Sequence, residues 1–243
     1  MRDEEVIVLG KWTGELVSEI IHESASIKGA GERIAFLSER FIGTKYKEET
    51  LIGGLDTAEV FVINLDAMDC FTFIEYVEAM RCSASYTEFK TNLATVRYRS
   101  GKVAFECRNH FFTDWKLYNA GHIDDATRLI GGRNTGQCLK TLNKKKGRGL
   151  FLPGIPISER EVYYIPARYI DGDIMSRLKT GDYIGIYSED SGLDVSHAGI
   201  LVRDGVNTVL RHASSSPELR KVVDQDFLGY VSARPGIIVL RPK

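Results

Sequence analysis

Four short β-like segments crowd into the last third of the chain, and this spacing limits the fold more than any other feature. They read YIGIYS, SHAGILVR, NTVLRHAS and GIIVLRP, all within residues 183–242. Strands that follow one another so closely form antiparallel sheets, because parallel neighbours need a crossover of a dozen residues or more. The first third instead has helical periodicity. Helices first and strands later predict an α+β fold.

The rest of the chain is less regular. Apolar residues at helical spacing over 16–21 and 34–42 predict two helices, with Gly43 as the C-cap of the second. Residues 59–65 (EVFVINL) predict a strand, and 87–96 a further helix. A helix is also predicted within 158–179, despite Pro166 and Gly172. Loops and short elements are expected from about 102 to 157.

A single domain over residues 1–243 is expected, because the chain has no internal repeat and no Pro- or Ser-rich linker. Its first part, to about residue 57, is expected to be helical and to pack on the antiparallel sheet. Residues from about 100 to 157 are expected to be an elaboration, with loops inserted around the cleft.

The balance of charges excludes a net positive electrostatic field that would attract nucleic acid or an anionic membrane to the whole protein. The 243 residues carry 32 basic and 33 acidic side chains, a formal net charge of -1. The one basic run, LNKKKGRG, is interpreted as a solvated loop, because no aromatic residues interleave with its charges to stack bases. No apolar run approaches the roughly 18 residues that a membrane span needs. We expect a monomer with neither nucleic acid nor membrane insertion.

The cysteines point away from disulfides and metal. Cys70, Cys82, Cys107 and Cys138 show no CxxC spacing and no histidine at zinc-ligand spacing, so free thiols and no metal or organic cofactor are expected. The acidic N-terminus MRDEEVIVLGKW does not resemble a secretory leader. The expected compartment is therefore the cytoplasm, or the periplasm or exterior if a leader has been removed.

Cys70 opens a predicted helix over residues 69–81, with Asp69 as its N-cap. A thiol attacks a carbonyl only as thiolate, and the first turn of a helix favours that anion. The unpaired N–H groups there also stabilise an oxyanion. The alternative is that Cys70 is a small core residue on the apolar stripe of the helix.

Two histidines change that balance. His197 begins the apolar run AGILV and His212 ends the run TVLR, with the turn-forming segment Asp204–Asn207 between them. A hairpin loop of two or four residues would put both imidazoles on one sheet face, roughly 5–8 Å apart, and an odd-length loop would separate them. On one face, the pair fits a general base, His197, and a group, His212, that fixes its tautomer.

These segments, in this order, resemble the NlpC-type papain-like cell-wall cysteine peptidases and amidases. DCFTFIEYVEAM, SHAGILV and LRHAS carry the resemblance, together with RIAFLSERFIGTKY, VINLDAMDC, YRSGKVAFECRNHFFTDW and KVVDQDFLGYV. The chain is most similar to the branch described as N-acetylmuramoyl-L-alanine amidase-like. The resemblance implies a papain-like (NlpC-type) fold over most of the chain.

The resemblance also implies roles for individual residues. Cys70 matches the nucleophile, His197 the base and His212 the polar group that orients it, which gives a Cys-His-His triad. Tyr46 matches a tyrosine that lies beside the nucleophile in relatives, although the segment between the two is about twice as long here. Substrate contacts are expected at Tyr46 and Asp69, and within the cluster Arg108, Asn109, His110, Asp114 and Trp115, which is otherwise interpreted as loop structure.

The implied activity is hydrolysis of a peptidoglycan fragment (a muropeptide) at the amide between N-acetylmuramic acid and L-alanine, through an acyl-thioester. An NlpC-type endopeptidase that cuts the stem peptide after γ-D-glutamate uses the same chemistry, and the residues do not separate the two. A glycan- or peptide-binding module, with Phe111, Phe112, Trp115 and Tyr118 stacking on sugars, is a different class of alternative. Carboxylate pairs such as Asp124-Asp125 or Asp171-Asp173 are interpreted as turns and caps rather than a glycosidase site.

Overall fold

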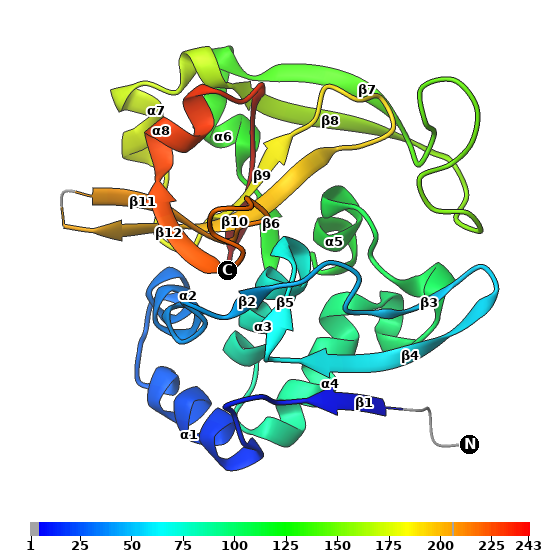
Figure 1. The fold of residues 1–243 in the computed structure, drawn as a ribbon. Coiled ribbons are helices and arrows are strands. Elements are labelled where there is room, and N and C mark those ends of the chain that lie inside the picture. The colour runs from blue at the N-terminus through cyan, green and yellow to red at the C-terminus, as the bar shows by residue number, and fades with distance from the viewer. Residues whose placement is uncertain (1–4, 206) are drawn as a thin grey trace. The chain divides into compact units, whose positions relative to one another are not determined.

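The computed structural model describes residues 5–205 and 207–243, and the chain forms two compact units. Unit 1 contains the chain up to Asn109 together with Arg211–Asp224. Unit 2 contains His110–Leu210 and Gln225–Lys243. The expectation of one amidase domain over the whole chain stays a prediction, and each unit is described by itself (Figure 1).

Unit 1 combines α-helices with small sheets. Its helices are α1 (Gly14–Ala25), α2 (Ala30–Glu39), α3 (Cys70–Arg81) and α4 (Tyr86–Arg97), followed by the short 3-10 helices η1 (Arg99–Gly101) and η2 (Phe105–Cys107). Its strands are β1 (Glu5–Val8), β2 (Lys45–Tyr46), β3 (Ile52–Gly54), β4 (Thr57–Asn64) and β5 (Ala67–Met68). The N-terminal part thus contains strands as well as the predicted helices.

The larger sheet of unit 1 is built around β4. The order of the larger sheet is β1-β4-β3, with β1 parallel to β4 and β3 antiparallel to it. Figure 1 shows β3 and β4 as a long hairpin, coloured cyan. A second, two-stranded sheet pairs β2 in parallel with β5, so that Tyr46 lies opposite Met68.

The core of unit 1 surrounds α3. This helix is buried at every position from Thr72 to Met80 and packs against α1, α2 and α4. Aromatic rings line these contacts, with Phe73 at 6.0 Å from Phe41 and Tyr76 at 6.4 Å from Phe89 between ring centroids. The predicted helix over residues 69–81 and its Asp69 N-cap are confirmed.

A buried ion pair ties α3 to α4. Arg97 Nε donates to Glu75 Oε2 at 2.7 Å, and Arg97 also donates to the carbonyl of Val62 at 2.6 Å. Both charged side chains are within 2% of full burial. Burial raises the pKa of Glu75, and the guanidinium of Arg97 opposes that shift.

Unit 2 is dominated by strands. They are β6 (Ile123–Asp125), β7 (Gly136–Leu142), β8 (Ser158–Pro166), β9 (Tyr183–Tyr187), β10 (Val195–Asp204) and β13 (Gly236–Pro242). Its helices are α5 (Phe112–Tyr118), α6 (Thr127–Gly131), α7 (Gly172–Arg177) and α8 (Phe227–Ser232), with the 3-10 helices η3 (Gly132–Asn134) and η4 (Ala167–Tyr169). Figure 1 shows α6, α7 and α8 gathered at one end of this unit.

The unit 2 strands are antiparallel in the order β10-β9-β13-β8-β7, and β6 pairs with β13. β11 (Asn207–Ala213) follows β10 in the strand order, and β12 (Val222–Asp226) follows β11. The chain passes from unit 2 to unit 1 within β11 and returns within β12. The predicted antiparallel sheet is confirmed, as is the mixed α+β class.

One apolar cluster forms the core of unit 2. It contains Ile165 of β8, Ile184 of β9 and Val239 of β13, against which Ile130 of α6 and Phe227 of α8 pack. These helices therefore cover a sheet face whose side chains are almost all branched and apolar.

The predicted helix within 158–179 is largely wrong. Residues 158–166 form β8, which pairs with the whole of β7, from Gly136↔Tyr164 to Leu142↔Ser158. A run of β-branched and aromatic side chains, Val162 to Ile165, favours this strand. Within 158–179 only the 3-10 helix η4 and the short α7 are helical, and the pairing partner β7 lies in the stretch expected to hold loops. Gly43 is also no C-cap, since α2 ends with Arg40 as its cap.

Replacing Arg97 with Met should reduce the free energy of unfolding by about 3–5 kcal/mol at neutral pH, because it leaves the Glu75 carboxylate buried without its partner. The loss should shrink as the pH falls, because protonation removes the uncompensated charge. Urea denaturation checks both effects. The double variant Glu75→Gln/Arg97→Met is the matched control and should be more stable than the single variant. A loss below about 1 kcal/mol in Arg97→Met would contradict the role of this pair.

Candidate active site

A capping box organises the start of α3. Asp69 Oδ1 accepts hydrogen bonds from the backbone N–H of Phe71 at 2.9 Å and of Thr72 at 2.8 Å. The Thr72 hydroxyl in turn accepts from the backbone N–H of Asp69 at 3.0 Å. This reciprocal arrangement fixes where the helix begins. Because the carboxylate of Asp69 is engaged in the cap, its structural role outweighs the predicted contact with substrate.

Cys70 is the first residue of the helix and is partly exposed. Aligned peptide dipoles leave partial positive charge at this end of α3, which favours an anion on a side chain in the first turn. The capping N–H groups compensate the negative charge of Asp69 next to it. A partly exposed thiol at a helix N-terminus has the surroundings of a reactive cysteine rather than of an inert buried one.

Strand pairing places Tyr46 beside this helix start. β2 runs parallel to β5, with Tyr46 opposite Met68, two residues before Cys70. The backbone N–H of Tyr46 donates to the carbonyl of Arg220 at 2.9 Å, and the Arg220 guanidinium lies 4.8 Å from the Tyr46 ring centroid. Tyr46 is thus held from both sides, by β5 and by the segment that precedes β12.

The surroundings of Tyr46 keep its phenol protonated. Partial burial, and after it the nearby Cys70, Glu48 and Asp69, raise the pKa of Tyr46 to about 12, and Arg220 opposes the shift. The influence of Cys70 shows that thiol and phenol are electrostatic neighbours. At neutral pH the Tyr46 hydroxyl is therefore available as a hydrogen-bond donor.

The long segment between Tyr46 and Cys70 forms a hairpin. β3 and β4 form this hairpin within the segment, and Arg108 binds Glu59 of β4 with Nη2–Oε2 at 2.5 Å. The extra residues form this hairpin between β2 and β5, and β2 and β5 still pair in parallel. The greater sequence spacing therefore does not remove Tyr46 from the neighbourhood of Cys70.

His212 belongs to unit 1 and is 1% exposed. Its neighbour Arg211 anchors the strand: it forms two 2.8 Å hydrogen bonds with the carboxylate of Asp224 and donates to the carbonyl of Ala35 at 2.9 Å. Farther along, the Ser214 N–H donates to the carbonyl of Lys221, which is bridged to Lys45. A continuous set of backbone contacts thus leads from the strand of His212 to β2.

His197 belongs to unit 2, on β10 opposite Ile186 of β9. The pairing has an irregularity between Val195 and His197, and such bulges re-aim side chains near active sites. The imidazole is partly exposed, and its centroid lies 6.2 Å from that of Tyr230. β10 and β11 are neighbouring strands, as expected for the hairpin, but Val206 of its turn lies outside the described residues. That both imidazoles share one face stays a prediction.

Sequence reasoning missed Asp194, three residues before His197. This buried carboxylate accepts from the Thr113 N–H at 2.7 Å, the Thr113 hydroxyl at 2.8 Å and the Val195 N–H at 2.7 Å. It therefore caps α5 and fixes the start of β10 at once. Burial raises the pKa of Asp194, and these hydrogen bonds oppose the shift. The only sequence signal is an acid ahead of a strand, which is too common to identify it.

The other expected substrate contacts are mostly buried. Trp115 is 0% exposed, stacked on Phe112 and edge-on to Tyr183 at 5.1 Å between centroids. Asn109 is 1% exposed and donates to the carbonyls of Arg97 and Val96. Burial favours structural roles for both, and it removes Trp115 as a stacking platform for sugars. His110 is partly buried, and its role stays a prediction.

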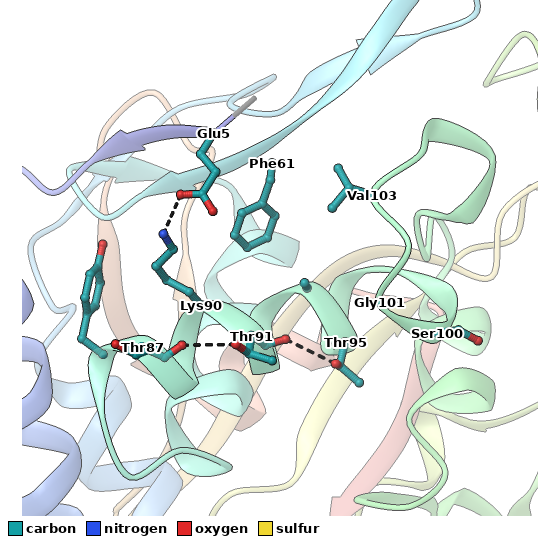
Figure 2. A pocket seen from close by; sticks show the side chains of 11 residues that line it. Glu5, Phe61, Thr87, Lys90, Thr91, Thr95, Ser100, Gly101 and Val103 are labelled. Atoms are coloured by element: carbon teal, nitrogen blue, oxygen red, sulfur yellow. Dashed lines mark hydrogen bonds and ion pairs between the residues drawn. The ribbon is translucent and has the colours of Figure 1, made fainter. Parts of the chain in front are cut away.

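A groove of about 650 Å³ lies elsewhere in unit 1, between α4 and the edge of the sheet (Figure 2). Glu5 of β1 and Lys90 of α4 form an ion pair across it at 2.5 Å. The hydroxyls of Thr91 and Thr95 bond to carbonyls of their own helix, both at 3.3 Å. The groove does not include Cys70, Tyr46 or His212, so it forms no part of the candidate site.

Tyr46 should titrate near pH 12, well above the ordinary tyrosine value of about 10. The folded state holds this proton more tightly than the unfolded chain, so stability should fall as the pH rises from about 10 toward the folded-state pKa. NMR of protein labelled at tyrosine Cζ, with the signal assigned through Tyr46→Phe, measures the midpoint. Tyr163, a partly exposed tyrosine of unit 2 that is hydrogen-bonded to Glu161, is the internal comparison for an alkaline titration outside the site. A Tyr46 midpoint near 10 would contradict its placement.

Solved structures resemble this chain over nearly its full length. An N-acetylmuramoyl-L-alanine amidase from Bacteroides uniformis is 27% identical, with a TM-score of 0.73 over 88% of this chain and 99% of that one. A protein from Bacteroides fragilis described as a candidate xylanase is 29% identical, with a TM-score of 0.70 over 84% and 99%. A Legionella pneumophila protein matched to the DUF1460 family model is 23% identical, with a TM-score of 0.79 over 94% of both chains, and shows the fold alone.

No curated protein matches the chain. A family model does, over residues 36–237, which span the described site residues from Tyr46 to His212 and most of both units. The chain belongs to the AmiA-like family, described as N-acetylmuramoyl-L-alanine amidase-like.

Proposed function

We propose that the protein is a cysteine amidase that hydrolyses the N-acetylmuramoyl-L-alanine amide of peptidoglycan fragments. The observation that carries the proposal is the position of Cys70 at the capped start of α3, beside a protonated Tyr46. Membership of an amidase-like family and 27% identity to a protein named as such an amidase support the same bond. We propose that the fold is of the papain-like NlpC type.

In the proposed first step, His197 takes the proton of the Cys70 thiol, which gives a thiolate and an imidazolium. The thiolate attacks the amide carbonyl, forming a C–S bond and an oxyanion. The backbone N–H of Cys70 and the phenol of Tyr46 are the proposed oxyanion donors. As the C–N bond breaks, the imidazolium of His197 protonates the leaving amine.

In the second step, neutral His197 accepts a proton from water as the water attacks the thioester carbonyl. A C–O bond forms, the C–S bond breaks, and the imidazolium returns its proton to the Cys70 sulfur. No group outside the chain is consumed except water. His212 is proposed to orient His197, and its burial and the anchoring of Arg211 to Asp224 suit a side chain held in one position.

Replacing Cys70 with Ala should lower muropeptide turnover by at least about a hundredfold, because the proposed nucleophile is lost. Mass spectrometry of a defined muropeptide measures the rate and identifies the bond. A free sugar fragment and an intact stem peptide support the proposal, whereas a released dipeptide assigns cleavage after γ-D-glutamate. Cys107→Ala is the control, another partly exposed thiol of unit 1, and should keep activity. A loss below a hundredfold in Cys70→Ala, or turnover of xylan by the wild type, would overturn the assignment.

Replacing His197 with Gln should also lower the rate by a factor on the order of 100 or more, because the general base is lost. The remaining activity should rise with pH as hydroxide generates the thiolate, whereas the wild type should reach a plateau once His197 is neutral. His122→Gln, an exposed histidine of the same unit, is the matched control. Equal pH–rate profiles for the wild type and His197→Gln would remove His197 from the mechanism.

A further inference from the structure

A cationic projection in unit 2 is not used by the proposed mechanism. Residues 126–158 contain no Asp or Glu, although the whole chain is nearly neutral. Within this stretch Lys144, Lys145, Lys146 and Arg148 are all exposed. Among the described residues, no ion pair joins any of the four to an acidic side chain. Positive charge is therefore concentrated on one short segment between β7 and β8.

Backbone pairing shapes this segment, residues 143–151, into a small hairpin that we call the basic finger. Phe151 N–H donates to the carbonyl of Asn143 at 3.0 Å, and Lys145 N–H donates to that of Gly149 at 3.2 Å. Lys144 and Leu150 form the bridge between these two bonds. Gly147 and Gly149 have φ of +96° and +101°, which only glycine adopts without strain, and both lie in open space.

The base of the basic finger is fixed by one buried side chain. Asn143 is 0% exposed, donates to the carbonyls of Leu152 at 2.9 Å and Ile155 at 2.6 Å, and accepts from the Leu152 N–H at 2.7 Å. Its own N–H donates to the carbonyl of Gly192 in the β9–β10 connection at 2.9 Å. The backbone that carries the cations is thus fixed in advance, so less conformational entropy is lost when the basic finger binds a ligand.

Apolar side chains accompany the cations in the connection between β7 and β8. Leu150 pairs with Lys144 across the hairpin and is half-buried, and Ile157 at the end of the connection is 47% exposed. Phe151, the one aromatic residue of the basic finger, packs at Gly192, and the ammonium of Lys145 lies 5.6 Å from its ring centroid. Its ring therefore stabilises the hairpin. Figure 1 shows this connection extending away from α6, α7 and α8.

We propose that the basic finger docks the protein on an anionic lipid surface. Lysine and arginine near such a surface are attracted to lipid phosphates, and adjacent apolar side chains enter the interface. A soluble polyanion would use the charges but gain nothing from Leu150 and Ile157. Nucleic acid recognition of single strands would need exposed aromatic rings among the cations. The mixture of cations and apolar side chains therefore favours lipid, with peripheral binding and no inserted span.

Flotation with vesicles of phosphatidylglycerol and phosphatidylcholine, compared with phosphatidylcholine alone, tests the proposal on the full chain. The triple variant Lys145→Gln/Lys146→Gln/Arg148→Gln should bind anionic vesicles on the order of a hundredfold more weakly, at about fivefold per cation. Raising the salt toward 1 M should release the wild type, since the screening length falls to about 3 Å. Lys28→Gln/Arg133→Gln/Lys179→Gln changes the net charge equally at other exposed positions and should bind like the wild type.

The variant Ile157→Ser distinguishes binding to a lipid surface from binding to a soluble polyanion. It should weaken vesicle binding several-fold while leaving binding to soluble polyphosphate unchanged. Near-UV circular dichroism checks that each variant is folded. Equal binding to neutral and anionic vesicles, equal loss in the two triple variants, or polyphosphate binding with no vesicle binding would overturn the proposal. An Ile157→Ser variant that binds vesicles like the wild type would also overturn it, in favour of a simple polyanion site.

Discussion

The burial of α3 is the constraint on which the chemistry of unit 1 depends. A helix covered at every position from Thr72 to Met80 can present functional groups to a substrate only at its ends. The capping box of Asp69 fixes the N-terminal end, and Cys70 is the first residue beyond it. The same burial explains why the helix needs the Glu75–Arg97 pair, since an acid on the inner turns must be compensated. The packing of α3 therefore determines that the Cys70 thiol is accessible at the N-terminal end of the helix.

The surroundings of Cys70 are assembled by contacts that are distant in sequence. The parallel β2–β5 pair returns Tyr46 to the helix start, and the backbone of Arg220 holds it from the other side. Between them the chain makes the β3–β4 hairpin, which adds length without changing the pair. The number of residues between Tyr46 and Cys70 therefore does not indicate whether they are neighbours. The register of the β2–β5 pair does, because it places Tyr46 opposite Met68.

The sequence correctly predicts those features that depend only on neighbouring residues. The period of α3 and its Asp69 cap are encoded within a dozen residues, and the sequence predicted both. The helix predicted at β8 is wrong because the β-branched and aromatic run of β8 pairs with β7, a strand whose own sequence has no clear period. Trp115 was assigned to the substrate because burial cannot be recognised in an irregular stretch, although it lies in the core of unit 2. Tertiary pairing and burial are what the sequence alone could not supply.

Both units use a carboxylate to set the element that carries a candidate catalytic residue. Asp69 caps α3 just before Cys70, and Asp194 caps α5 and binds the first N–H of β10 ahead of His197. In each case the carboxylate accepts hydrogen bonds from backbone N–H groups at the start of the element that it fixes. Such a cap fixes backbone position at small cost in side-chain entropy, because Asp has few rotatable bonds. The two elements that carry these candidate residues are thus each held by a short acid.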